Sequence, residues 1–188
     1  MCTISKKKVS WTIDSNFIRD IKKNLKEGKN EQAGVLLFRD INCNDGICQK
    51  MSTKYRISKG NGSSVYTPNG LINFHTHPKF AYKHEGAVYG WPSGEDMAAC
   101  INFAKGGTLI HIVFTLEGAY IIKVNKILNS KDTKLLENLF KTTHVYRSSD
   151  QRNQLSDFKD TFELPGNNTV KMWLNLTNSI SLNKLYTL

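Results

Sequence analysis

The sequence predicts an α/β domain. Short apolar runs typical of strands alternate along the chain with segments whose apolar residues recur at helical spacing. Of the 188 residues, 39% are hydrophobic and 22% are charged, which is the composition of a globular protein and not of a disordered one. A chain of this length can bury a full core without disulfide bonds, so we expect one main domain.

The first predicted elements are a short strand at residues 9–13 and a helix that ends near Lys26. Asp14 or Ser15 supplies the N-cap, and Gly28 is a good helix stop. The apolar residues of this helix recur on one face, which we expect to be buried: Phe17, Ile18, Ile21 and Leu25.

Three apolar segments predict the next strands, at residues 33–38, 51–58 and 71–74. Between the first two, Asn44-Asp45-Gly46-Ile47 favours a tight hairpin turn. The third segment ends directly at a pair of histidines, and residues 78–92, which contain aromatic residues, glycines and two prolines, predict a loop.

The next part of the chain predicts a helix from Ser93 to about Ala104, ended by Gly106-Gly107. A further helix is predicted at residues 133–141. Between these helices lie two strands joined by a turn at Glu117-Gly118, at residues 108–115 and 119–124.

These elements divide the chain into a basic N-terminal segment (1–9), a main domain (10–143) and a C-terminal extension (144–188). The extension is rich in asparagine and weakly periodic, and residues 170–176 are its only good strand.

The overall composition limits the classes of function. The formal net charge of +10 favours an acidic partner, but the charge is spread thinly and no nucleic-acid-binding motif or basic-aromatic patch accompanies it. No apolar run is long enough to span a bilayer, and no signal peptide follows the first lysines. We therefore expect an intracellular protein, cytoplasmic or nuclear, without membrane or nucleic-acid partners. The abundance of Asn, Lys and Ile indicates an AT-rich genome, as in a virus or a parasite.

The four cysteines are too few and too irregular for a secreted disulfide framework: Cys2, Cys43, Cys48 and Cys100. Cys43 and Cys48 could form half of a zinc site, but no second pair at matching spacing follows them. We therefore expect two reduced thiols beside a turn, and Cys100 packed in the core.

The residues with the clearest chemistry are His75-Thr76-His77-Pro78 and, further on, Asp96. Residues i and i+2 of a strand point to the same face, so His75 and His77 can present two imidazoles to one ion. Asp96, in the first turn of the following helix, can complete a three-ligand set that leaves a fourth position open, as in catalytic zinc sites. Taken separately, His-x-His is a weak signal, and Ser-x-x-Asp is more often a capping box.

At these residues the sequence resembles the JAMM (MPN+) metalloprotease family, whose signature is an upstream Glu, His-(Ser or Thr)-His-Pro and Ser-x-x-Asp. The second half of the signature is matched by Ser93-Gly94-Glu95-Asp96, and Trp91 adds a likeness to the proteasome-lid deubiquitinase and the COP9-signalosome deneddylase. The upstream acid is Glu31, in the context Glu-x-x-Gly before an apolar strand, which Glu27 lacks. The resemblance implies a cytidine-deaminase-like fold with a central mixed β-sheet flanked by helices.

The resemblance also implies the roles of the site residues. His75, His77 and Asp96 would bind Zn²⁺, Glu31 would act as general base and pass its proton to the leaving amine, and Ser93 would hydrogen-bond the developing oxyanion. The implied reaction is hydrolysis of the isopeptide bond between ubiquitin, or a ubiquitin-like protein, and a lysine. The extended tail of that substrate could pair along a sheet edge.

The sequence departs from the family in one place. Fourteen residues, 79–92, separate Pro78 from Ser93, where the family usually has seven. This insertion could be a lid, a substrate-binding loop or an inhibitory plug in which His84 or Glu85 reaches the metal. Its aromatic residues are candidate substrate contacts, or they pack on their own domain: Tyr82, Tyr89 and Trp91.

Two other interpretations remain open. A JAMM-like domain could serve as a non-catalytic scaffold in a larger complex or viral particle, with a vestigial or shielded metal site. A nucleic-acid-associated protein is the weaker alternative, because only the net charge favours it. His111, within a predicted strand, is expected to be a satisfied core or edge histidine.

Overall fold

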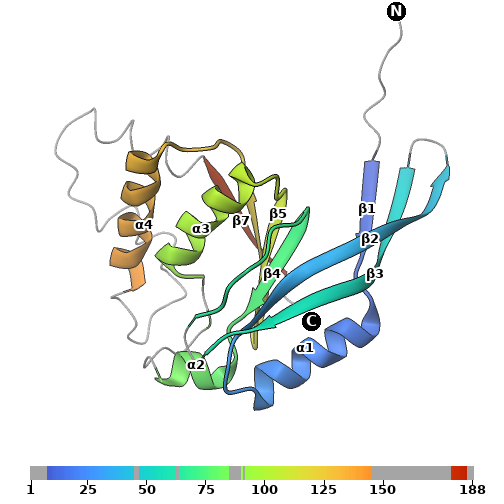
Figure 1. Ribbon diagram of the computed structural model, residues 1–188, viewed down its shortest axis with the longest axis horizontal. Coiled ribbons are helices and arrows are strands. Elements are labelled where there is room, and N and C mark those ends of the chain that lie inside the picture. Colours follow the sequence, from blue (N-terminus) through green and yellow to red (C-terminus); the bar gives the residue numbers. More distant parts are fainter. Residues whose placement is uncertain are drawn as a thin grey trace, which may run out of the picture.

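Strands from both ends of the chain share one sheet. The computed structural model describes residues 8–44, 47–61, 64–84, 90, 92–144 and 179–185 (Figure 1). Its strands are β1 (Lys8–Thr12), β2 (Gln32–Asn44), β3 (Ile47–Lys59), β4 (Ile72–Thr76), β5 (Ile110–Thr115), β6 (Gly118–Val124) and β7 (Ile180–Leu185). Its helices are α1 (Ser15–Glu27), α2 (Lys79–His84), α3 (Gly94–Lys105) and α4 (Ser130–His144).

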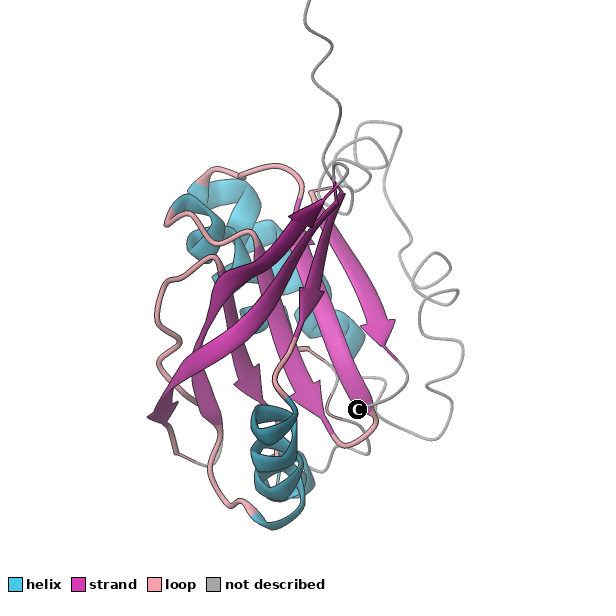
Figure 2. Cartoon of the chain, turned by 90° about the vertical axis from the view of Figure 1, so that its right-hand side faces the viewer, coloured by secondary structure: helices cyan, strands magenta, loops and turns pink. Residues whose placement is uncertain are grey.

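The strands form a mixed sheet in the order β1-β3-β2-β4-β5-β6-β7. The pairs β1–β3 and β4–β5 are parallel, and the other neighbours are antiparallel. Helix α1 lies on one side of the sheet, and α3 and α4 lie on the other (Figures 1 and 2). The predicted α/β class, with a central mixed sheet flanked by helices, is therefore confirmed.

Helix α1 packs on the sheet through the apolar face that its sequence predicts. Asp14 caps the helix by accepting from the backbone N–H groups of Asn16 and Phe17, at 2.9 and 3.1 Å. The buried side chains of this layer come from α1 and from the centre of the sheet: Phe17, Ile21, Leu25, Leu36, Ile72, Phe74, Ile112, Phe114 and Ala119.

Helices α3 and α4 cover the opposite face of the sheet. The core there joins side chains of α3, of α4 and the segment before it, and of β5, β6 and β7: Met97, Cys100, Ile101, Val113, Tyr120, Ile122, Leu128, Leu136 and Ile180. Cys100 is buried as expected, and burial raises the pKa of its thiol. Because residues alternate along β4 and β5, this is also the face that carries Asn73, His75 and His111.

Glycine is required where β2 passes over the aromatic core. A Cβ at Gly34 would lie 1.8 Å from the carbonyl oxygen of Arg56 and 2.8 Å from the ring of Phe74. Any side chain would push β2 away from its neighbours. The glycine thus maintains the pairing in which Ala33 of β2 lies opposite His75 of β4.

Several boundaries differ from the sequence predictions. Strands β2 and β3 are longer than predicted, because they continue as an antiparallel hairpin up to the pair Asn44–Ile47. The prediction of a loop throughout 78–92 is wrong, because Lys79–His84 forms α2. The predicted strand at 170–176 lies outside the described residues, but the C-terminal extension does contribute β7, which extends the sheet beside β6.

In the described part of the chain, no helix combines the length and apolar character needed to cross a bilayer.

Phe17 of α1 packs against three other aromatic rings. Its ring lies 4.8 Å from that of Tyr55, 5.0 Å from Phe74 and 5.8 Å from Phe114, measured between centroids. We predict that Phe17→Ala lowers the free energy of unfolding by about 3–5 kcal/mol. Chemical denaturation measures this, with Tyr66→Ala as the control, because Tyr66 is 79% exposed and its loss should cost less than about 0.5 kcal/mol. Equal effects of both substitutions would contradict the packing described.

Candidate metal centre

The two histidines lie at the carboxyl end of β4, in the centre of the sheet. His75 pairs with Ala33 of β2 on one side and Val113 of β5 on the other. His77 follows the strand, and its backbone N–H still donates to the carbonyl of Phe114 at 2.9 Å. Two neighbouring strands therefore fix the backbone that carries both imidazoles.

The predicted ligand set comes together. The Nε2 atom of His75 lies 3.2 Å from Oδ1 of Asp96, and the Nε2 atom of His77 lies 3.5 Å from Oδ2. The two Nε2 atoms are 2.8 Å apart. Among the described residues, this trio is the group of His, Cys, Asp and Glu side chains whose ligand atoms converge, all within 4.8 Å of one another.

The start of α3 positions Asp96. Ser93 is the N-cap: its Oγ accepts from the Asp96 backbone N–H at 3.1 Å, and the Asp96 carboxylate accepts from the Ser93 backbone N–H. The alternative interpretation of Ser-x-x-Asp as a capping box is therefore confirmed, and the same carboxylate also faces both histidines. Because Oγ is the acceptor in its hydrogen bond with Asp96, that bond does not involve the hydroxyl hydrogen of Ser93.

The charges of the site support each other. Burial raises the pKa of Asp96, but the two histidines and the Ser93 backbone outweigh it and hold that pKa well below its usual range. Burial lowers the pKa of His75, yet Asp96 and Glu31 outweigh it and the net shift is upward. Asp96 and a protonated His75 therefore stabilise each other's charged form.

His77 presents its Nε2 nitrogen to the candidate site. Its Nδ1 atom lies 2.8 Å from the carbonyl oxygen of Gly90. A carbonyl only accepts, so Nδ1 carries the hydrogen and a neutral His77 has its lone pair on Nε2, toward Asp96. Imidazole nitrogen and carboxylate oxygen are the donors that zinc takes in three-ligand sites, so this set fits zinc.

Glu31 is close enough for its charge to act on His75, but it does not belong to the trio of His75, His77 and Asp96. Its backbone pairs with the end of β3, donating to Asn61 at 3.0 Å and accepting from Gly60 at 2.9 Å. Its side chain is buried, with 7% of its surface exposed, and its charge acts on His75. Glu31 immediately precedes β2 and stands two residues before Ala33, which lies opposite His75.

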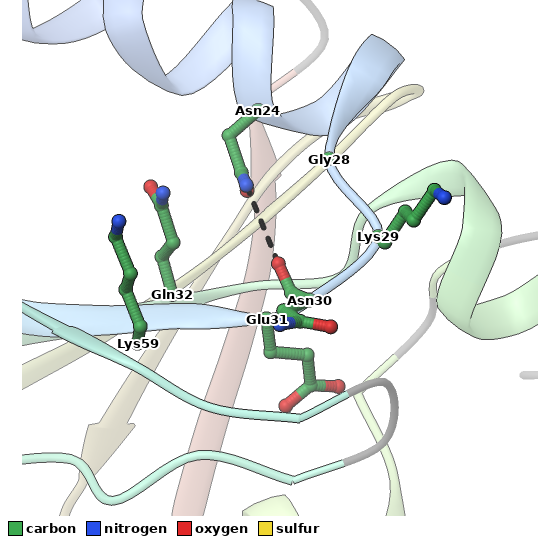
Figure 3. A pocket seen from close by; sticks show the side chains of 7 residues that line it. All are labelled: Asn24, Gly28, Lys29, Asn30, Glu31, Gln32 and Lys59. Atoms are coloured by element: carbon green, nitrogen blue, oxygen red, sulfur yellow. Dashed lines mark hydrogen bonds between the residues drawn. The ribbon is translucent and has the colours of Figure 1, made fainter.

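A cavity of about 200 Å³ lies at the turn between α1 and β2. It is lined by Asn24, Gly28, Lys29, Asn30, Glu31, Gln32 and Lys59. In Figure 3 the side chain of Glu31 points away from those of Gln32 and Lys59. Thr76 joins this turn to β4, because its Oγ1 accepts from the Gln32 backbone at 2.9 Å and donates to Asn24 at 2.8 Å. The position of Glu31 is therefore tied to the strand of the histidines.

The insertion returns to the site at Gly90. A Cβ there would lie 3.1 Å from Thr115 and 3.2 Å from His77, so the backbone fits closely between them. Its N–H donates to the Glu117 carboxylate at 2.8 Å, and the Tyr120 hydroxyl donates to the same oxygen at 3.4 Å. The end of the insertion therefore forms part of the frame of the site.

The structure does not describe the side chains of the three aromatic residues predicted to bind substrate. Tyr82 lies in α2, but its side chain lies outside the described residues, as do Tyr89 and Trp91 altogether. The same holds for the His84 side chain and for Glu85, the two residues considered as a plug. Cys43 and Cys48 are cross-strand partners in the β2–β3 hairpin.

The sequence predicts His111 as a satisfied core or edge histidine, and it does not reveal that the partner of this side chain is His75. His111 is buried, with 2% of its surface exposed, and its Nε2 lies 2.7 Å from Nδ1 of His75. Burial lowers the pKa of His111 well below its usual value, and the neighbouring His75 lowers it further. Asn73 contacts the other ring nitrogen of His111.

Comparison with known proteins leaves the family open. No protein-family model matches the chain. A stretch of 64 residues is 36% identical to "Uncharacterized protein 3R" of Frog virus 3 (isolate Goorha). The stretch covers 34% of this chain and 14% of the length of that viral protein. This match agrees with the expectation of a viral or parasite source, and it carries no information about activity.

Two substitutions separate the metal-ligand role of Asp96 from its capping role. Asp96→Asn keeps an oxygen that can accept from Ser93 but removes the charge, so we predict a folded protein without stoichiometric zinc. Ser93→Ala removes the cap, so we predict a loss of about 0.5–2 kcal/mol of stability with zinc retained. Elemental mass spectrometry and thermal unfolding measure both. Full zinc content in Asp96→Asn would show that Asp96 is not a ligand.

Proposed function

We propose that this protein is a zinc-dependent isopeptidase that hydrolyses conjugates of ubiquitin or a ubiquitin-like protein. The observation that carries the proposal is the convergence of His75 Nε2, His77 Nε2 and the Asp96 carboxylate within 4.8 Å, at the end of a central strand. Two imidazoles and one carboxylate leave a position open on a tetrahedral ion, which is the arrangement of catalytic and not structural zinc.

A bound zinc ion would supply Lewis acidity and a water that ionises near neutral pH. The residues around it would perform the proton transfers. Glu31, which is buried and lies outside the ligand trio, would accept a proton and deliver it to the leaving amine. Ser93, whose Oγ accepts from the Asp96 backbone, would direct its own hydrogen toward the developing oxyanion.

The substrate class rests on the resemblance of these motifs to the JAMM family. Among the described strands, those at the site already pair on both sides, so the edges open to the extended tail of a ubiquitin-like protein are β1 and β7. The insertion is the element best placed to select the conjugate, because it ends at Gly90 against His77. We retain Tyr82, Tyr89 and Trp91 as its proposed substrate contacts, and a protein partner as a proposed activator.

The second candidate is a non-catalytic, JAMM-like scaffold of a larger complex or viral particle. The close packing of Gly90 between Thr115 and His77 favours it, because an insertion fixed at the site can also shield it. The two candidates differ in whether the zinc-bound protein turns over substrate.

We predict that Glu31→Gln lowers hydrolysis by a factor of about 10² to 10⁴ and leaves the zinc content unchanged, because an amide cannot accept the proton. The assay uses the zinc-loaded protein and fluorescent lysine-isopeptide conjugates of ubiquitin and of several ubiquitin-like proteins. Glu27→Gln is the matched control: Glu27 is an exposed acid at the end of α1, and its substitution should have no effect.

Activity that persists in Glu31→Gln would assign the base to another residue. A zinc-bound wild-type protein that cleaves none of the conjugates would favour the scaffold over the isopeptidase.

A further inference from the structure

Three buried polar side chains form a line that ends at the candidate metal centre. Asn73 and His75 lie on one face of β4, and His111 lies on β5 in direct register with Asn73. Their exposed fractions are 0%, 4% and 2%, respectively. The contacts are Asn73 Oδ1 to His111 Nδ1 at 2.7 Å and His111 Nε2 to His75 Nδ1 at 2.7 Å. Buried polar groups of this kind are retained only when each is satisfied.

A backbone carbonyl fixes the direction of the first hydrogen bond. The amide nitrogen of Asn73 donates to the carbonyl oxygen of Pro68 at 3.3 Å. The amide oxygen of Asn73 therefore faces His111, and it can only accept. His111 must carry a hydrogen on Nδ1.

The second hydrogen bond follows from the first. His111 is enclosed in the core under the ring of Phe103, with centroids 5.2 Å apart, and its contacts are an amide and another imidazole. A buried imidazolium without a carboxylate contact is costly, so His111 is neutral and its Nε2 is an acceptor. His75 must then donate from Nδ1, so a neutral His75 has its lone pair on Nε2, toward Asp96 and His77.

We propose that Asn73 and His111 are positioning residues, which hold His75 in the one tautomer and ring orientation that can bind a metal through Nε2. The proposal rests on the metal centre of the proposed function, which it deepens. This Asn73–His111–His75 relay, together with the Gly90 carbonyl at His77, turns the Nε2 atoms of both histidines toward Asp96, where an ion would take the place of a proton. The opposite tautomer of His75 would place a hydrogen where the ion must bind.

The first test compares His111→Phe with His111→Gln in the full chain. Phenylalanine fills the space but offers no acceptor for Nδ1–H of His75, so we expect zinc affinity to fall by a factor of about 10 to 100. Glutamine can present its side-chain oxygen at that point and should retain most of the affinity. Competition with a chromophoric chelator measures both. Unchanged affinity in His111→Phe, with one zinc bound in the wild type, would overturn the relay and leave the zinc centre intact.

The second test reads the tautomers directly and needs neither zinc nor substrate. Nitrogen-15 NMR of the zinc-free wild-type protein should show His75 and His111 both protonated at Nδ1. In Asn73→Leu, which removes the acceptor for Nδ1–H of His111 and frees its ring, the Nδ1-protonated form of His75 should lose population. A His75 that carries no hydrogen on Nδ1 in the wild type would overturn the proposal. A zinc-bound protein with these tautomers but no isopeptidase activity would support the relay and count against the proposed reaction alone.

Discussion

The parallel pairing of β4 with β5 is the constraint on which the rest of the site depends. It fixes the strand that carries His75, brings His111 into register with Asn73, and ends where His77 turns out of the sheet. On the other side of β4, Gly34 lets β2 approach closely enough for the turn before it to hold an acidic residue beside the histidines. A change in the register of β4 with β5 would separate His75 from His111, and a change in its register with β2 would separate Glu31 from the histidines.

Neighbouring groups fix the orientation of each candidate ligand side chain. His77 is oriented by the Gly90 carbonyl, His75 by His111, and Asp96 by the capping box of α3. Each orienting group is backbone or buried, so it costs little to keep in place once the fold has formed. The scaffold and the enzyme candidates share this frame, because both need a rigid end of β4, and they diverge only in what Glu31 and the insertion do there.

The sequence was most informative where the signal is local. Capping residues and apolar spacing predicted α1 and α3, and two short motifs predicted the ligand trio. Helix α2 was not predicted, because a helix of 6 residues is too short to show apolar periodicity. The full length of the β2–β3 hairpin and β7 were not predicted, because pairing with other strands decides them. The contact between His111 and His75 depends on the register of two strands, for which a single sequence gives no signal. The roles of Glu31 and Ser93 stay predictions, although the structure brings Glu31 to the histidines and makes Ser93 the cap of Asp96.

The most direct test of the central claim is X-ray absorption at the zinc edge on the purified, zinc-loaded full chain. The arrangement of His75, His77 and Asp96 predicts nitrogen and oxygen neighbours at about 2.0–2.2 Å, with the outer scattering of two imidazoles and no sulfur. A sulfur shell at about 2.3 Å would instead point to Cys43 and Cys48, which pair across the hairpin. Such a shell, or a protein that takes up no zinc, would contradict the metal centre described.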